Sequence, residues 1–333
     1  MQVISSPQEF NVAQLYVDLT DLAAAPLFLK CEGFNFAGSI KLKAAVEMVN
    51  AAERDGRLRP GATIVESSSG NLGVALSIVA TSRGYRFLCV TDARCTLTAR
   101  QLMQALGATV HVMNEPDVEL GFLGVRLRHV RRLCAENPEY VWLNQYRNPA
   151  NWGAHARTTG PELLAAFPDL DVLFVGAGTT GTLMGCARHL AVHKPSVRVV
   201  AVDSVGSVTF GSPPAPRMIP GLGTSVRPGI LDESFVDDVV LVDEADTVRA
   251  CRTLAGKGFL FGGSTGTVLS GALRWLGEHD VSDRDGDRPV AVAIAPDLGE
   301  RYLDTVYHDQ WVADIYGEEV LTDVARTLSG RAR

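Results

Sequence analysis

The sequence has little of what marks a nucleic-acid-binding, membrane or disulfide-bonded secreted protein. Its 31 Lys and Arg are outnumbered by 38 Asp and Glu, and the resulting net charge of −7 argues against nucleic-acid binding as the main role. No basic patch followed by an apolar core begins the chain, and no apolar run approaches the length of a membrane span. The 6 cysteines show no Cys-x-x-Cys spacing, which favours buried free thiols in a reducing compartment. We therefore expect a cytoplasmic protein without a nucleic-acid partner, a membrane partner or a metal site.

Internal repeats and low-complexity tracts are also missing, and strand and helix patterns alternate instead. With 333 residues, the chain is too long for one small core, so two lobes are expected. The βαβα order predicts an α/β protein with open, doubly wound parallel sheets. The predicted strands are 27–30, 63–65, 86–90, 109–112, 172–175, 197–202 and 290–294, and the predicted helices include 41–54, 72–83, 98–106, 182–193 and 266–276. An irregular stretch rich in Gly and Pro, residues 206–229, has the length of a functional loop.

Two short motifs in the first quarter of the chain suggest chemistry on an amino acid. Lys41 follows the turn Gly38-Ser39 at the start of a predicted helix. The segment 66–73, Glu-Ser-Ser-Ser-Gly-Asn-Leu-Gly, is a small polar loop that opens the next helix. A lysine near an anion-binding helix start is what Schiff-base chemistry on an amino acid requires.

A third motif, Gly176-Ala177-Gly178-Thr179-Thr180-Gly181, directly follows a predicted strand and fits two functions. Its G-x-G-x-x-G spacing is the dinucleotide fingerprint, and Asp203 ends the next strand, where a ribose-binding acid would lie. The same N–H groups and threonine hydroxyls suit a single compact phosphate. This pattern alone leaves both an NAD-dependent dehydrogenase and a pyridoxal 5′-phosphate (PLP) enzyme open.

The other two motifs favour PLP, because a dehydrogenase has no obvious need for them. Together the three motifs resemble the cysteine synthase/cystathionine β-synthase family of PLP enzymes. The resemblance extends to segments 144–151, 155–162 and 261–266. Four further segments are similar to a narrower group within that family: Asn151-Trp152, 201–211, 220–225 and 296–304. Members of this group join O-phospho-L-serine to L-glutamate on the way to 2,3-diaminopropionate, a siderophore and antibiotic building block.

One departure from the cysteine synthase pattern and one agreement with it bear on the alternative function. Leu42-Lys43 stands where many cysteine synthases have Asp-Arg, which puts the use of sulfide in doubt. Gly178, in contrast, is usual in cysteine synthases and leaves an acetylated donor open. The alternative to the glutamate-using enzyme is thus a cysteine synthase that combines O-acetylserine or O-phosphoserine with sulfide.

The resemblance implies a two-lobed fold of the tryptophan synthase β type, in which each lobe is an open, mostly parallel sheet flanked by helices. A small mobile lobe would span residues 35–148, and a large PLP-binding lobe would combine residues 12–34 and 149–325. It also implies amino-acid substrates, a homodimer and, downstream, an NAD-dependent dehydrogenase that acts on the product.

The resemblance also assigns roles to individual residues. Lys41 would be the catalytic lysine that carries PLP and moves the α-proton. The remaining cofactor contacts would come from Asn71 at the 3′-oxygen, from Ser264 at the pyridine nitrogen, and from Gly178, Thr179, Thr180, Gly181 and Thr182 at the phosphate. The donor carboxylate would bind to Ser68, Ser69, Asn71 and Gln145, and Arg227 would serve the anionic groups of the substrates.

Overall fold

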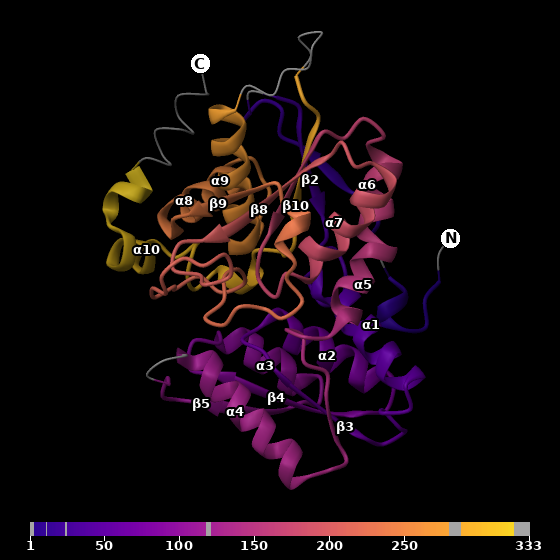
Figure 1. Cartoon of the computed structure of the whole chain (residues 1–333). Coiled ribbons are helices and arrows are strands. Elements are labelled where there is room, and N and C mark those ends of the chain that lie inside the picture. The colour runs from indigo at the N-terminus through magenta and orange to yellow at the C-terminus, as the bar shows by residue number, and fades with distance from the viewer. Residues whose placement is uncertain (1–2, 11, 24, 118–120, 280–287, 323–333) are drawn as a thin grey trace.

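Two β-sheets organise the chain, and helices cover both faces of each sheet (Figure 1). The computed structural model describes residues 3–10, 12–23, 25–117, 121–279 and 288–322. The larger predicted lobe thus ends, at residues 323–325, outside the described part of the chain. The α/β class and the alternation of strands and helices are confirmed.

The larger sheet has six strands in the order β1-β2-β10-β7-β8-β9. Its strands are β1 (Tyr16–Asp18), β2 (Leu27–Cys31), β7 (Val172–Gly176), β8 (Arg198–Ser204), β9 (Asp238–Val242) and β10 (Ala291–Ala295). The strands from β2 to β9 pair in parallel, as the sequence predicts, although β9 is not among the predicted strands. β1 was not predicted and pairs with β2 antiparallel. A short connection is enough for an antiparallel pair, whereas a parallel pair needs a long crossover.

The smaller sheet has four parallel strands in the order β5-β4-β3-β6. Its strands are β3 (Thr63–Ser67), β4 (Arg86–Asp92), β5 (Thr109–Met113) and β6 (Tyr140–Trp142). The sequence does not predict β6, because its three residues are only half-buried and too few to show a period.

Separate apolar clusters attach the helices to the sheets. On the smaller sheet, α1 (Lys41–Arg54), α2 (Asn71–Ser82) and α3 (Leu97–Ala105) pack on one face and α4 (Gly121–Glu136) on the other. On the larger sheet, α8 (Glu244–Gly256) and α9 (Gly263–Glu278) cover one face, and α6 (Thr159–Ala166) and α7 (Gly181–His193) cover the other. The remaining helices are α5 (Pro149–Arg157), α10 (Asp309–Tyr316) and the short 3-10 turns Pro7–Glu9, Glu233–Phe235 and Glu300–Tyr302.

The carboxyl ends of the central strands bring the predicted motifs together. β3 leads into the polar loop before α2, β7 leads into the glycine-rich turn before α7, and β10 leads to Asp297. Ligands of open α/β sheets bind at this edge, so the topology places the candidate site between the two sheets. Within the described ranges, no helix is long and apolar enough to cross a membrane.

Candidate active site

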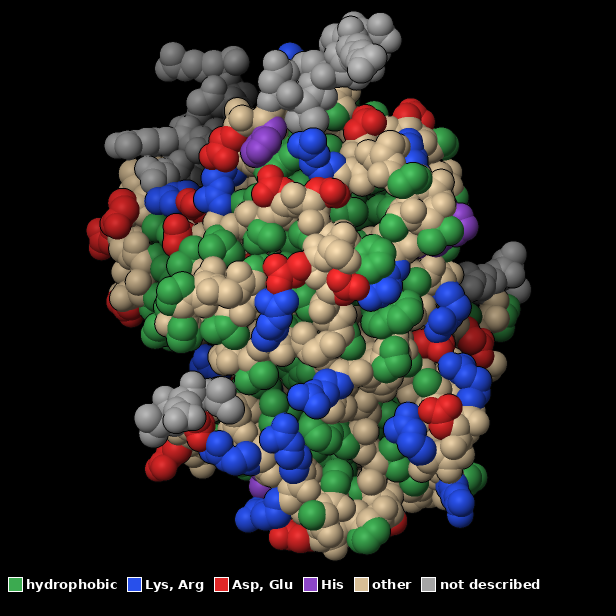
Figure 2. Space-filling view, viewed as in Figure 1, with side chains coloured by type: hydrophobic (Ala, Val, Ile, Leu, Met, Phe, Trp, Pro, Cys, Tyr) green, Lys and Arg blue, Asp and Glu red, His purple; other side chains and the backbone are tan. Residues whose placement is uncertain are grey.

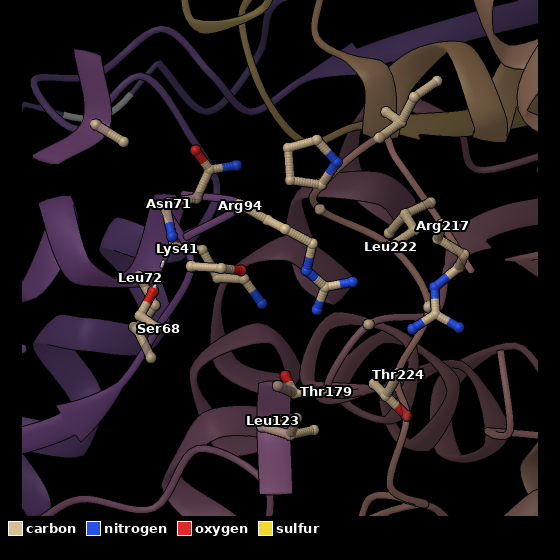
Figure 3. A pocket seen from close by; sticks show the side chains of 18 of the residues that line it. Lys41, Ser68, Asn71, Leu72, Arg94, Leu123, Thr179, Arg217, Leu222 and Thr224 are labelled. Atoms are coloured by element: carbon tan, nitrogen blue, oxygen red, sulfur yellow. Dashed lines mark hydrogen bonds between the residues drawn. The ribbon is translucent and has the colours of Figure 1, made fainter. Parts of the chain in front are cut away.

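Two adjoining cavities lie between the sheets, and Lys41, Asn71, Gly178 and Thr179 line both of them. The outer cavity, drawn in Figure 3, also contacts Ser68, Ser69 and Gln145, which the sequence assigns to the donor. The inner cavity contacts Ser264 and the remaining residues of the predicted phosphate loop, Thr180, Gly181 and Thr182. The structure therefore brings together every predicted site residue except Arg227.

Lys41 is the first residue of α1, and the backbone around it is fixed by the segment after β10. Gly38 has a φ of 61°, which favours glycine, and the Ile40 N–H donates to the Pro296 carbonyl at 2.7 Å. Burial lowers the pKa of the Lys41 ammonium to about 8, although the nearby Asp297 carboxylate acts to raise it. The amine of Lys41 is thus deprotonated more easily than that of an ordinary lysine.

The turn before α7 is built to receive an anion. Thr180 has a φ of 65°, and a Cβ at Gly181 would lie only 2.1 Å from Oδ1 of Asn151, so the turn admits no larger residue there. Oγ1 of Thr180 is buried and has no hydrogen-bond partner within the described chain. This orphaned hydroxyl points to a missing polar ligand, and the first N–H groups of the 13-residue helix α7 can bind the same ligand.

Side chains from α5 support this turn. Nδ2 of Asn151 donates to the Thr179 hydroxyl at 3.0 Å, and Nε2 of His155 lies 3.3 Å from the Thr182 hydroxyl. Burial, together with the charges of nearby lysines, lowers the pKa of His155 well below its usual range, so the imidazole is neutral. Asn151 and His155 lie in segments that resemble the family, 144–151 and 155–162, but the sequence does not show that they contact the turn.

Hydrogen bonds within the smaller sheet and its loops fix the polar loop before α2. Oγ of Ser68 accepts hydrogen bonds from the N–H groups of Gly70 at 3.2 Å and Gly73 at 2.9 Å. Buried Glu66 accepts from the Gln145 N–H at 3.2 Å, and Gln145 Nε2 donates to the Ser67 carbonyl at 2.8 Å. Gln145 is therefore fixed beside the loop, although its position in the chain is remote.

Asp297 is a buried acid that connects three parts of the site. Its Oδ2 accepts from Asn71 Nδ2 at 3.0 Å, from the Tyr302 hydroxyl at 2.5 Å and from the Ser264 hydroxyl at 3.4 Å. Burial raises the pKa of Asp297, and these donors act against the rise. The sequence assigns no role to Asp297 itself, although a polar residue directly after a fully buried strand was a usable signal.

Arg227 lies outside both cavities. It is half-exposed, forms an ion pair with Glu233, and is absent from the described residues that line the two cavities. Its predicted contact with substrate thus gains no support from its position. The arginines that line the outer cavity are Arg94, Arg126, Arg217 and Arg301. Sequence reasoning missed them because each comes from a different segment of the chain.

Asp203 also lies outside the described lining of both cavities. It is fully buried at the end of β8, and its Oδ1 accepts from the Ser204 N–H at 2.8 Å. Burial raises the pKa of Asp203 to about 6, and Ser207, Ser204 and Arg217 act to lower it. This position does not suit an acid that would bind the ribose of a dinucleotide in these cavities.

Lys43, which stands where many cysteine synthases have Arg, belongs to a network of largely buried ion pairs. Lys43 reaches Glu32 at 3.0 Å and Glu162 at 2.8 Å, and the same two acids pair with Lys30 at 3.0 and 2.8 Å. Three of the four side chains are at most 10% exposed, and Glu162 is 15% exposed. The network joins α1, which begins with Lys41, to β2 and α6.

A lysine that deprotonates readily, beside a turn whose N–H groups and hydroxyls suit an anion, fits Schiff-base chemistry on a phosphorylated cofactor. The fold and the site thus define an enzyme that carries a phosphorylated aldehyde cofactor on a lysine. Residues 15–292 match the family described as pyridoxal-phosphate dependent enzyme, and the chain belongs to that family. PLP is its cofactor, and the dehydrogenase alternative is wrong.

Similar proteins agree with this assignment. The chain is 40% identical over 308 residues to N-(2-amino-2-carboxyethyl)-L-glutamate synthase of Ralstonia nicotianae, a match covering 92% of this chain and 88% of that protein. It is 38% identical over 306 residues to the enzyme of the same name from Cupriavidus metallidurans, covering 91% and 89%.

Solved structures share the fold over nearly the whole chain. O-ureido-L-serine synthase has a TM-score of 0.84 and 34% identity, covering 95% of this chain and 96% of that one. The O-acetylserine dependent cystathionine β-synthase from Helicobacter pylori has a TM-score of 0.83 and 26% identity, covering 92% and 100%. These matches confirm the predicted two-sheet PLP fold.

Proposed function

We propose that the protein joins O-phospho-L-serine and L-glutamate to give N-(2-amino-2-carboxyethyl)-L-glutamate by β-replacement. The observation that carries this proposal is the charge of the outer cavity. Its described lining contains Lys41 and four arginines but no Asp or Glu, in a chain whose net charge is −7. Figure 2 shows basic side chains along the boundary between the upper and lower parts of the molecule.

The positive charge of the outer cavity is more than binding of the PLP phosphate requires. The phosphate of PLP would bind to the N–H groups and hydroxyls before α7, and that turn contains no cation. The arginines of the outer cavity therefore remain for the substrates. O-phosphoserine brings a phosphate and a carboxylate, and glutamate brings two carboxylates, all of which pair well with guanidinium groups. The names of the two synthase relatives support glutamate as the acceptor.

The residues present fit PLP, and their proposed roles follow from their positions. Lys41 would hold PLP, which acts as an electron sink for the α-carbon when bound. Ser264 would face the pyridine nitrogen, Asn71 the 3′-oxygen, and the residues from Gly178 to Thr182 the phosphate. A serine at the pyridine nitrogen, unlike a carboxylate, leaves that nitrogen unprotonated, which favours elimination over transamination.

The chain's own groups would then bind the donor and move the proton. Ser68, Ser69, Asn71 and Gln145 would bind the donor carboxylate, and the donor amine would take the place of Lys41 on the cofactor. The freed neutral amine of Lys41 would then remove the α-proton and later return it. The bond from Cβ to the phosphate oxygen breaks and inorganic phosphate leaves. A bond from Cβ to the glutamate nitrogen forms, and that amine loses a proton. No oxidant or reductant is required.

Other parts of the account are proposals of the same kind. We propose that residues 35–148 form a mobile lobe that closes on the donor, that the enzyme is a cytoplasmic homodimer, and that an NAD-dependent dehydrogenase consumes its product for 2,3-diaminopropionate in siderophore or antibiotic biosynthesis. The resemblance of the sequence supports these points.

The test is incubation of the PLP-loaded enzyme with all pairs of O-phosphoserine or O-acetylserine with glutamate or sulfide. The proposal expects fastest turnover with O-phosphoserine and glutamate, and a product containing both carbon skeletons. Lys41→Ala is the inactive control. Faster formation of cysteine from sulfide would favour the cysteine synthase alternative.

A further inference from the structure

The four arginines of the outer cavity differ in how closely their charge is already engaged by neighbouring groups. Arg126 forms an ion pair with Asp92 at 3.1 Å, and Arg301 donates to Asn71 Oδ1 at 2.5 Å and to the Ala37 carbonyl. Arg94 lies 3.7 Å from Asp92, a partner that it shares with Arg126. Arg217 forms no ion pair with any residue of the described ranges. Because Arg301 is bound to Asn71, a proposed cofactor contact, and Arg126 has a close acid, Arg94 and Arg217 are the cations most available to a second ligand.

These two side chains face the same space from different parts of the fold. Arg94 follows β4 of the smaller sheet, whereas Arg217 belongs to the irregular stretch 206–229 after β8 of the larger sheet. Figure 3 shows both guanidinium groups directed into the outer cavity. Burial lowers the pKa of Arg217, and the charge of Arg94 lowers it further, while Asp203 and Glu244 act to raise it. Two guanidinium groups that repel each other favour an anion between them.

The position of Arg217 is fixed by its surroundings. Its guanidinium donates to the Gly206 carbonyl and to the Ser225 hydroxyl, the latter at 3.5 Å. The following backbone is anchored because Glu244 accepts from the Met218 N–H at 2.9 Å and from the Ile219 N–H at 2.7 Å. Little rotamer freedom remains to be lost on binding, so the group is preorganised.

The exposure of Arg94 separates it from the space beside Lys41, where the donor binds. The donor amine must reach Lys41, next to the polar loop and the phosphate turn. The side chain of Arg126 is 6% exposed, whereas that of Arg94 is 45% exposed. A substrate that binds after the donor has occupied the space beside Lys41 would therefore meet Arg94 at the exposed side of the same cavity.

We propose that Arg94 and Arg217 bind the carboxylates of the acceptor, a dicarboxylic amino acid, and so orient its amine toward Cβ of the donor. This inference rests on the proposed function and names the acceptor subsite within it. Because the pair bridges the smaller and larger sheets, acceptor binding also holds the two sides of the cavity together.

The test compares Arg94→Gln and Arg217→Gln with the parent enzyme, each loaded with PLP. Each variant should raise the KM for glutamate roughly tenfold or more, as expected for a lost charge-assisted contact. The donor titration, followed through the visible spectrum without acceptor, should change by less than about twofold. Preference for glutamate over glutamine should also fall, which a merely structural defect would not cause.

Two further variants serve as comparisons. Arg132→Gln removes an exposed arginine of α4 outside the cavity and should leave every constant unchanged. Arg227→Ala tests the position that the sequence favours. A larger effect at Arg227 than at Arg94 and Arg217 would overturn the assignment.

The possible failures are distinguishable. If the parent enzyme uses glutamate but both glutamine variants keep its KM, only the acceptor subsite is wrong. If the variants weaken the donor titration instead, the pair binds the donor and the assignment is again wrong. If the parent enzyme uses sulfide and no dicarboxylic amino acid, both the proposed function and this subsite are wrong.

Discussion

The lowered pKa of Lys41 makes a quantitative prediction for the enzyme without PLP. With a pKa of about 8 instead of 10.5, the neutral amine makes up roughly one-tenth of Lys41 at pH 7, compared with about one part in 3,000 for an ordinary lysine. The amine that attacks an aldehyde is the neutral form. Lys41 should therefore react at pH 7 roughly 300 times more readily than its unshifted pKa would permit.

The assay is competitive labelling with an amine-reactive reagent, in which mass spectrometry follows Lys41 and the exposed Lys257 between pH 6.5 and 10. Reactivity at Lys41 should rise with pH and level off above about 8. Asp297→Asn removes the negative charge that raises this pKa, so the midpoint should fall further. A midpoint near 10.5, or a midpoint that rises in Asp297→Asn, would refute the reasoning.

Three other substitutions test separate parts of the site. Ser264→Asp should impair turnover much more than PLP binding, since a carboxylate would protonate the pyridine nitrogen; kcat and the Kd for PLP measure this, and normal turnover would remove Ser264 from that role. Gly181→Ala should weaken PLP binding at least tenfold because the methyl group would collide with Asn151, and unchanged affinity would contradict the tight turn. Glu162→Gln should lower the free energy of unfolding at pH 7 by about 3 kcal/mol, because it leaves buried lysines without one of their acids. Burial acts to raise the pKa of Glu162, but Lys43 and Lys30 lower it below its usual value of 4.5. The loss of stability in Glu162→Gln should therefore shrink as the pH falls below 4.5 and Glu162 of the folded parent becomes protonated. Urea unfolding of both proteins at pH 7 and below pH 4.5 measures this, and an equal loss at the two pH values would contradict it.

The local part of the structure could be predicted from the sequence because it depends on periodicity and turns. Residues 41–54 show the helical period and form α1 with the predicted bounds. The turn before α7 is recognisable from its glycines, although its pattern alone did not separate PLP from a dinucleotide. That choice required a second motif, Lys41, at a distant place in the chain.

What could not be predicted depends on contacts between remote segments. Asp297 joins Asn71 and Ser264 only after both sheets have formed. Which arginine lines the cavity also depends on contacts between remote segments. Arg217 and Arg227 lie in one irregular stretch without a period, and only the fold shows that Arg217 lines the cavity while Arg227 pairs with Glu233.

The measurement that tests the central claim most directly is a reaction of the PLP-loaded enzyme with O-phospho-L-serine and glutamate labelled with ¹⁵N at its α-amine. The account predicts one inorganic phosphate released for each product, and a product in which NMR shows the ¹⁵N bonded to both the glutamate α-carbon and the former Cβ of serine. Lys41→Ala should give neither. Release of phosphate without a new carbon–nitrogen bond, or label that stays entirely in free glutamate while added sulfide yields cysteine, would contradict it.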